Sequence, residues 1–350
     1  MSALREVLEQ LLDRRNLSEA QAADLLVALT DPTLSPALGG ALLAGLRAKG
    51  VTADEVRGFA KTMRKLARRP ILPDGGPLID LVGTGGDGSG SFNLSTGAAL
   101  LVAAMGIRVA KHGTSSVSSR CGSADVVRAL GLNLPLDEKA SGECLAATGF
   151  TFFFAPHYHP AMKAVMPIRQ ALGVRTVFNI LGPLSNPAEP QFHLIGAYHI
   201  DIAALMADTL AGMPIERAFV VHGEPGWDEA TPIGPFTIFD VRPGQVTRAQ
   251  RSAEEFALPR CTAEELKGGD AAYNAEHLRA VLEGRDRGAH RSAIVLQAAL
   301  VLELIGKVSS SIEAAKMAQD AIDAGAGRKI LERIAAFGKG ETPSPPTANR

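Results

Sequence analysis

The spacing of apolar side chains predicts only helices in the N-terminal part of the chain. Leucine and valine recur there at helical spacing, at Leu4, Val7, Leu8, Leu11 and Leu12. Two pairs have the spacing of a capping box, which marks the beginning of a helix: Ser18 with Gln21, and Thr52 with Glu55. The stretch "ARRPILPDGGP" then interrupts the pattern with proline and glycine. We therefore predict a small all-helical domain over residues 1–72.

Beyond Leu78 the apolar residues form short runs separated by helix-like stretches. Five runs are typical of buried parallel strands: "LIDLVG", "IRVAKHG", "FTFFFAP", "HLIGAYH" and "RAFVVHG". This alternation predicts the fold class α/β, with a mostly parallel central sheet over residues 73–340 and an antiparallel excursion at "PFTIFDVRPGQVTRAQ". The polar, proline-rich end, residues 341–350, is expected to be a disordered tail.

Composition excludes several classes of partner. The 350 residues carry 36 basic and 37 acidic side chains, so neither nucleic acid nor an anionic membrane is expected as a partner. Apolar runs free of charge stay shorter than the roughly 18 residues of a membrane span. Three cysteines far apart form neither a disulfide framework nor a zinc pattern, which favours a cytoplasmic location.

The stretch "DLVGTGGDGSGSFNLST" predicts a loop that binds phosphate. Five glycines after a strand let backbone N–H groups approach an anion, and Asn93, Ser95 and Thr96 add donors where the next helix begins. Gly83, Gly85 and Gly88 also match the dinucleotide fingerprint, but five residues separate them from the helix and no acidic residue ends the next strand. Asp87 beside a phosphate requires a bridging cation or a role in bracing the loop.

Three further segments carry candidate chemistry. "KHGTSSVSSRCGSAD" follows a strand and concentrates hydroxyl donors behind Lys111, which suits a polyanion. Asp228 and Glu229 follow another strand, and Mg²⁺ typically binds through one or two carboxylates and substrate phosphates. In "HYHPAMKAVMPIRQALGVRT", Arg169 has the geometry to bind a carboxylate, and His159 is a candidate to orient an amine.

Together these motifs resemble the signature stretches of the anthranilate phosphoribosyltransferase family. The resemblance rests on "GTGGDGSGSFNLST", "KHGTSSVSSRCGSAD", "HPAMKAVMPIRQALGVRTVFNILGPLSNPA" and "VVHGEPGWDEA", in the family's order and over nearly the whole chain. It implies transfer of phosphoribosyl from phosphoribosyl pyrophosphate (PRPP) to the amine of anthranilate, a step of tryptophan synthesis. It also implies a Mg²⁺ cofactor, helices near 165–190 that join the helical domain, and a homodimer formed through that domain.

The resemblance also assigns residues to each substrate. It implies PRPP binding by Gly83, Gly86, Asp87, Ser91, Asn93, Leu94, Ser95, Thr96, Lys111, His112, Gly113, Ser118, Ser119 and Ser123. It implies acceptor binding by Gly83, Thr114, His159 and Arg169, and metal binding by Ser95, Asp228 and Glu229.

One departure from the family pattern leaves alternatives open. The usual K-H-G-N-R is "KHGTS" here, so Thr114 replaces an asparagine amide by a single hydroxyl, and Ser115 replaces an arginine. The same PRPP chemistry on another aromatic amine or nitrogen acceptor therefore remains an alternative. Nucleoside phosphorolysis and a non-catalytic PRPP- or nucleic-acid-binding relative are further alternatives, and an NAD(P)-dependent oxidoreductase is the weakest.

Overall fold

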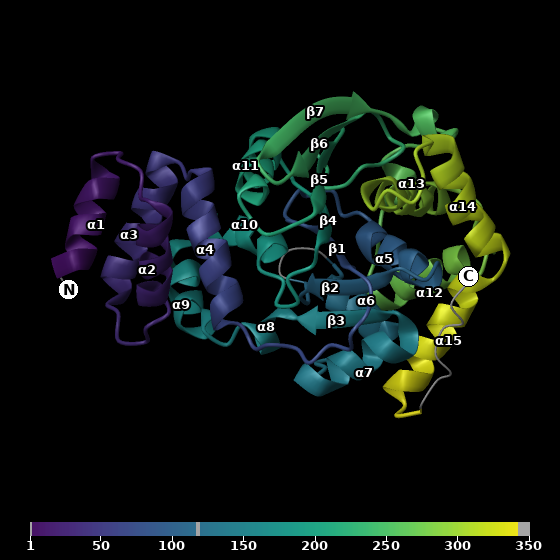
Figure 1. Ribbon diagram of the computed structural model, residues 1–350, viewed down its shortest axis with the longest axis horizontal. Coiled ribbons are helices and arrows are strands. Elements are labelled where there is room, and N and C mark those ends of the chain that lie inside the picture. Colours follow the sequence, from purple (N-terminus) through teal and green to yellow (C-terminus); the bar gives the residue numbers. More distant parts are fainter. Residues whose placement is uncertain (1, 117–119, 342–350) are drawn as a thin grey trace.

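The computed structural model describes residues 2–116 and 120–341, which form a helical part beside a larger α/β part (Figure 1). Both predicted capping boxes are present, because the Ser18 and Thr52 side chains accept from the backbone N–H groups three residues later. The four N-terminal helices are α1 (Ser2–Leu12), α2 (Glu19–Leu29), α3 (Pro36–Lys49) and α4 (Ala53–Leu66).

In the described residues, seven strands form one sheet in the order β3-β2-β1-β4-β5-β6-β7. The strands from β3 to β5 in that order are parallel, and β6 and β7 are antiparallel, which confirms the predicted sheet and its excursion. The run "FTFFFAP" ends as a strand at Phe154, because Pro156 lies in the first turn of a short helix. The strands are β1 (Leu78–Gly83), β2 (Arg108–Gly113), β3 (Phe150–Phe154), β4 (Phe192–Gly196), β5 (Arg217–Gly223), β6 (Phe236–Arg242) and β7 (Gln245–Arg251).

Helices cover both faces of the sheet and bury its apolar residues. One core joins α5, α13 and their neighbours to β1, β2 and β5, and these helices are apolar nearly all round because they lie inside it. Figure 1 places α12 to α15 on the side away from the N-terminal helices. The helices of this first core and its surroundings are α5 (Leu94–Ala104), α6 (Ser123–Ala129), α7 (Glu138–Thr148), α12 (Ala271–Leu282), α13 (Ala289–Leu304), α14 (Ser311–Asp323) and α15 (Ala326–Gly338).

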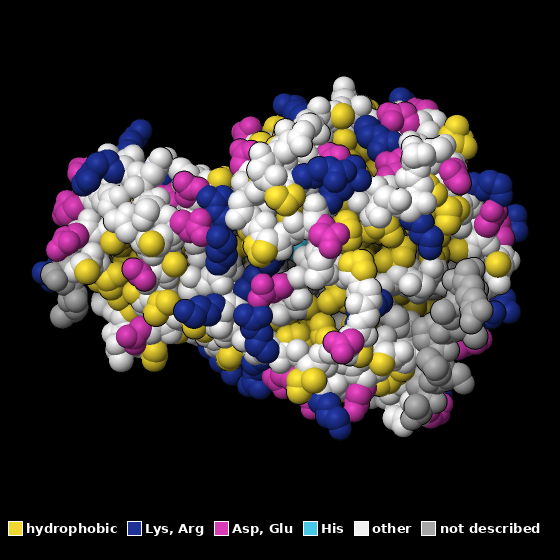
Figure 2. All heavy atoms as spheres, in the orientation of Figure 1, with side chains coloured by type: hydrophobic (Ala, Val, Ile, Leu, Met, Phe, Trp, Pro, Cys, Tyr) yellow, Lys and Arg dark blue, Asp and Glu magenta, His cyan; other side chains and the backbone are white. Residues whose placement is uncertain are grey.

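A second core is shared between the helical part and the other face of the sheet. Residues of α1 to α4 pack in one cluster with α9, α11 and the β4 and β5 residues Ile195 and Val220. Lys and Arg side chains gather along the junction of the two parts in Figure 2. Here lie α8 (Ala155–Tyr158), α9 (Met162–Leu172), α10 (Phe178–Leu181), α11 (Ile200–Ala211) and the 3-10 turn η1 (Gly182–Leu184). Within the described ranges, no helix has the length and apolarity to cross a membrane.

Candidate active site

The glycine loop begins where β1 ends, and its glycines are required by backbone shape. Gly85, Gly86, Gly88 and Gly90 all have φ between 63° and 74°, in the left-handed region that residues with side chains rarely adopt. Gly83 is required for a different reason, since a Cβ there would lie 2.2 Å from Asp228 Oδ2. The loop is therefore shaped around the segment that follows β5.

Asp228 and Glu229 hold the glycine loop and the helix beyond it. Each side chain is 8% exposed. Asp228 Oδ2 accepts from the backbone N–H of Gly85 at 2.6 Å, and Glu229 Oε1 accepts from that of Ser95 at 3.1 Å. The sequence prediction placed these two acidic residues with Ser95, and the structure brings the three together.

Asp87 braces the loop from inside. Its Oδ1 accepts from the Ser89 backbone N–H at 3.0 Å and from the Ser89 hydroxyl at 2.9 Å. Its Oδ2 accepts from the backbone N–H of Asp228 at 3.3 Å. Asp87, Asp228 and Glu229, here called the acidic cluster, thus join the first loop to the segment after β5.

The acidic cluster carries more buried negative charge than its surroundings compensate. Burial, and then the charge of Asp87, raise the pKa of Asp228 to about 7. Burial and Asp228 likewise raise the pKa of Glu229. Glu229 Oε2 is buried and has no hydrogen-bond donor among the described residues. Hard carboxylate oxygens beside the Ser95 hydroxyl are a donor set that fits Mg²⁺.

Lys111 connects the acidic cluster to the second loop. Its ammonium is buried in β2, donates to the carbonyl of Leu81, and lies 3.4 Å from the Ser95 hydroxyl. Burial lowers the pKa of Lys111, while Asp80, Glu229 and Asp228 oppose that shift. Lys111 is thus a buried cation that faces several carboxylates from the strand side.

The second loop leaves β2 at Gly113 and leads to α6. A Cβ on Gly113 would lie 2.3 Å from Ser123 Oγ, so the two predicted site residues touch. Thr114 is exposed, and its carbonyl accepts from the Ala124 backbone N–H at 3.2 Å. Arg128 donates to the Ser115 hydroxyl at 3.0 Å. The predicted residues Ser118 and Ser119 lie outside the described residues.

The remaining donor residues lie around the start of α5. Asn93, its N-cap residue, donates to the Cys121 carbonyl of the second loop at 3.4 Å and accepts from Asn274 at 2.8 Å. Ser91 forms an isolated bridge with Lys267. Leu94 and Thr96 are fully buried in the first turn, whereas Gly86 is exposed. Asn93 therefore links the start of α5 to the second loop and to α12.

The predicted acceptor residues His159 and Arg169 lie in different places, and His159 lies beside His112, which was predicted to bind PRPP. His112 and His159 lie together, with ring centroids 5.0 Å apart, and His112 Nδ1 lies 3.0 Å from the Gly182 carbonyl. Arg169 lies on α9, with its guanidinium 5.4 Å from the centre of the Phe178 ring. Burial lowers the pKa of Arg169, and in the described part of the chain no carboxylate opposes that shift. Arg169 is thus a half-buried cation without an acidic partner there.

Sequence reasoning assigned no site role to two charged residues: Arg175, which lies between α9 and α10, and Asp80, which lies inside β1. Arg175 donates to the Gly86 carbonyl and stacks 4.1 Å from the centre of the Tyr198 ring. Asp80 is fully buried in β1, where it accepts from Asn186 at 2.9 Å, and burial raises its pKa to about 6. The available signal was a charged residue inside an apolar strand run, "LIDLVG", which is unusual without a partner.

Comparison with known proteins agrees with this geometry over most of the chain. The profile of the "Glycosyl transferase family, a/b domain" matches residues 75–328, and that of the "Glycosyl transferase family, helical bundle domain" matches residues 5–67. The anthranilate phosphoribosyltransferase of Desulforudis audaxviator is 43% identical over 95% of this chain and 96% of its own. That of Chloroflexus aggregans is 42% identical over 97% of this chain and 99% of its own.

Solved structures give the same result. The anthranilate phosphoribosyltransferase of Thermus thermophilus superposes with a TM-score of 0.88 at 39% identity, covering 95% of this chain and 99% of that one. The Saccharomyces cerevisiae enzyme in complex with PRPP and Mg has a TM-score of 0.87 at 26% identity, covering 97% and 98%. This chain belongs to the anthranilate phosphoribosyltransferase family, pentosyltransferases that move phosphoribosyl from PRPP to anthranilate in tryptophan biosynthesis.

Proposed function

We propose that this chain transfers 5-phosphoribosyl from PRPP to the amine of anthranilate and releases pyrophosphate. One observation carries the proposal: Asp228 and Glu229 are buried between the glycine loop and the start of α5, bonded to both. Carboxylates at this position can bind a cation, which in turn can bind a polyphosphate held by the glycine loop. Family membership indicates the reaction, and the hydrogen bonds of the acidic cluster explain why the loops have this shape.

We propose that the two loops hold PRPP. The glycine loop offers backbone N–H groups, and the start of α5 offers hydroxyls and the positive end of a helix dipole. The residues in this role are Gly83, Gly86, Asp87, Ser91, Asn93, Leu94, Ser95, Thr96, Lys111, His112, Gly113, Ser118, Ser119 and Ser123. Arg175 joins them, because it fixes the carbonyl of Gly86 from outside the loop.

We propose that Ser95, Asp228 and Glu229 hold Mg²⁺. The orphaned Glu229 Oε2 and the raised pKa of both carboxyl groups support a cation at this position. The Saccharomyces cerevisiae relative has been solved in complex with PRPP and Mg. When bound, Mg²⁺ would neutralise negative charge on the leaving pyrophosphate.

The acceptor half of the site is proposed on the side of the helical part. Arg169 offers a bidentate cation for the anthranilate carboxylate, with Gly83, Thr114 and His159 completing the acceptor residues. His112 faces the Gly182 carbonyl through Nδ1, so its proton lies there and the Nε2 lone pair is left to accept. Burial lowers the pKa of His112 to about 3, which keeps the ring neutral at pH 7.

The reaction requires positioning more than strong acid–base catalysis. The anthranilate nitrogen bonds to C1 of the ribose, the bond from C1 to the pyrophosphate oxygen breaks, and the nitrogen loses one proton. The reacting carbon passes through a state with sugar-cation character. Fixed donors in both loops stabilise the charge that develops on the leaving group. An aromatic amine is neutral at pH 7, so it attacks without prior deprotonation: the two neutral histidines accept hydrogen bonds from its N–H groups, and the departing pyrophosphate takes up the released proton.

The test combines substrate loss with product release. The purified protein is incubated with PRPP, Mg²⁺ and anthranilate, while anthranilate fluorescence and pyrophosphate are followed in the same sample. We expect equal rates for both signals and none without Mg²⁺. Pyrophosphate release with another aromatic amine but not with anthranilate would show that the other amine is the acceptor substrate. Binding of PRPP without pyrophosphate release for any amine would establish a non-catalytic protein.

We propose in addition that two copies of the chain form a cytoplasmic homodimer through the helical part. The supporting observation is an apolar groove between α3 and α9, whose α3 side carries small side chains, so that a second helix could approach closely there. Its lining includes Ala37, Gly40, Ala41, Pro167 and Leu172. Sedimentation of the wild type and of Ala41→Glu tests this, since a dimer through the groove dissociates in the variant. An unchanged dimer would place the interface elsewhere.

A further inference from the structure

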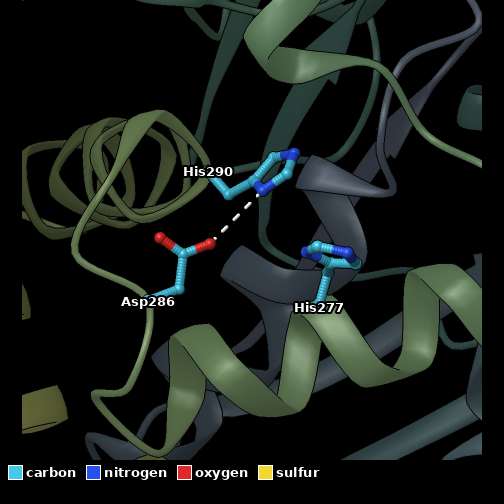
Figure 3. A group of neighbouring side chains, drawn as sticks. All are labelled: His277, Asp286 and His290. Carbon is cyan, nitrogen blue, oxygen red and sulfur yellow. Dashed lines mark hydrogen bonds and ion pairs between the residues drawn. The ribbon is translucent and has the colours of Figure 1, made fainter.

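A group of three side chains that could bind a metal lies beside Phe92, just after the glycine loop. His277 comes from α12, His290 from the first turn of α13, and Asp286 from the loop between these helices (Figure 3). In the described part of the chain, this is the one group of three in which a ligand atom of each residue lies within 4.8 Å of the others. All three side chains are partly buried.

The spacing of the ligand atoms is close to that of a zinc site. Zn²⁺ binds imidazole and carboxylate at about 2.0–2.2 Å, so neighbouring ligand atoms of a tetrahedral site lie about 3.3–3.5 Å apart. His290 Nδ1 and Asp286 Oδ2 are already 3.3 Å apart. The other oxygen, Asp286 Oδ1, accepts from the Gly288 backbone N–H at 2.7 Å, which fixes the carboxylate. Only His277 needs to move inward to complete the set.

Aromatic rings pack against both imidazoles. The His290 ring lies 4.4 Å from that of Phe92, and the His277 ring lies 4.1 Å from that of Tyr273. The centroids of the two imidazole rings lie 5.4 Å apart. A neutral imidazole is the form that coordinates metal.

We propose that His277, Asp286 and His290 form a binding site for a divalent transition metal of the zinc class. Two imidazoles and one carboxylate suit zinc, cobalt or nickel, whereas Mg²⁺ prefers oxygen ligands alone. The site is distinct from the acidic cluster in its ligand chemistry. Three protein ligands leave a fourth position for water.

The site is connected to the glycine loop through backbone and side-chain contacts. The Phe92 backbone N–H donates to the Leu266 carbonyl at 2.9 Å, and the Gly268 backbone N–H donates to the Gly90 carbonyl at 2.9 Å. Asn274, one turn before His277 on α12, donates to the Asn93 side chain at 2.8 Å. If the proposed PRPP function holds, a metal that fixes α12 to α13 also fixes the loop that receives PRPP. Ordering the loop beforehand strengthens PRPP binding.

The binding test uses Zn²⁺ alone, without PRPP, so its outcome does not depend on the proposed reaction. Excess Mg²⁺ occupies the oxygen site while Zn²⁺ is titrated by calorimetry, and Co²⁺ reports nitrogen coordination by its visible absorption. We expect one zinc site, weakened at least about tenfold in His277→Gln and in His290→Gln. His199→Gln is the matched control, since His199 pairs with Asp201 at 3.6 Å without a third ligand. Zinc affinity that survives both substitutions, or a shift of equal size in the control, overturns the site.

The coupling has its own readout. We expect Zn²⁺ to lower the KM for PRPP several-fold in the wild type at fixed Mg²⁺, and to leave it unchanged in His277→Gln. Without zinc, His277→Gln should keep the basal activity. An unchanged KM in a wild type that binds zinc overturns the coupling. Absence of pyrophosphate release with Mg²⁺ alone would instead refute the proposed function and leave the zinc titration valid.

Discussion

Two clusters of buried titratable side chains differ in how burial shifts their pKa values, which rise in one cluster and fall in the other. The acidic cluster, Asp87, Asp228 and Glu229, has raised pKa values at its two buried members, Asp228 and Glu229. A basic cluster lies towards the helical part. There burial lowers the pKa of Arg64 to about 10, of His112 and His193 to about 3, and of His159 to about 4.

The difference lies in what each cluster does at neutral pH. An imidazole with a lowered pKa is neutral at pH 7, as it also is in the unfolded chain, so the histidines need no counter-ion. A carboxylate is charged at pH 7 in the unfolded chain, and burying it without a cation costs free energy. Lys111 faces the acidic cluster, yet the pKa values of Asp228 and Glu229 stay raised, so a further cation would stabilise the cluster, whereas the neutral histidines need no ligand.

The largest expected effect comes from neutralising the acidic cluster. Asp228→Asn with Glu229→Gln should lower kcat/KM for PRPP by at least about 100-fold, because charge on the leaving group loses its stabilisation. The same change should raise the melting temperature of the metal-free protein, since it removes buried like charges. Steady-state kinetics over a Mg²⁺ series and thermal melts in chelator check both.

His159→Gln is the matched variant on the basic side. It removes a buried imidazole of similar size without touching the acidic cluster, so its loss of turnover and of metal dependence should be much smaller. Equal Mg²⁺ dependence in the wild type and the double variant would contradict the assignment of Asp228 and Glu229. A larger loss in His159→Gln would reverse the comparison.

Arg169 adds to the comparison a half-buried cation whose pKa shift no carboxylate of the described residues opposes. Arg169→Gln should raise the KM for anthranilate about 10- to 100-fold, the effect of losing a charged hydrogen bond, with little change in the KM for PRPP. Arg169→Lys should fall in between, because an ammonium cannot bind a carboxylate bidentately. Initial rates with each substrate varied in turn provide the check. A selective rise in the KM for PRPP would place Arg169 on the donor side.

The two clusters also predict opposite dependences of the free energy of unfolding on pH. Folded pKa values of about 3 for His112 and His193 lie below the unfolded 6.5, so their stabilising contribution is present above 6.5 and is lost as pH falls. Asp228, raised to about 7, stabilises below its unfolded value of 3.8 and loses that contribution as pH rises through 7. Between pH 4 and 6.5 the two contributions therefore oppose each other.

Removing one cluster member should expose the contribution of the other. In chelator, the melting temperature of Asp228→Asn should fall more steeply with acidification than that of the wild type, and that of His193→Gln less steeply. Thermal melts at half-unit steps from pH 4.5 to 8 measure the slopes. Parallel curves for all three proteins would refute the pKa shifts. Mg²⁺ should stabilise the wild type more at pH 8 than at pH 5.

Strands were the part of the fold best predicted from sequence, and the buried polar residues the worst. A buried parallel strand is an uninterrupted apolar run, so β1 to β5 stand out in the sequence and their loops locate Asp228 and Glu229. His193 and Arg64 look like ordinary polar positions of β4 and α4. Both side chains are buried because a shared core brings the helical part onto the sheet. No local sequence pattern encodes that contact.

The division at residue 72 and the role of each site residue stay predictions. The structure places Asp228, Glu229 and Ser95 together, and His112 beside His159. The Arg169 guanidinium instead contacts the Met166 sulfur and the Phe178 ring. Arg175 escaped prediction because its target, the Gly86 carbonyl, is a backbone atom exposed by a left-handed turn. Backbone acceptors of this kind carry no sequence signal of their own.

The smallest effect is expected at Thr114, where this chain departs from the family pattern. Thr114 is exposed and its backbone carbonyl, not its hydroxyl, holds the second loop to α6, so Thr114→Asn should fold without strain. An amide adds two donors towards the acceptor, and we expect kcat/KM for anthranilate to rise a few-fold with the KM for PRPP unchanged. A panel of aromatic amines measured in both proteins gives the specificity ratio. If Thr114→Asn gains with anthranilate while losing with another amine, the threonine selects a different acceptor; if all amines change alike, the loop only positions them.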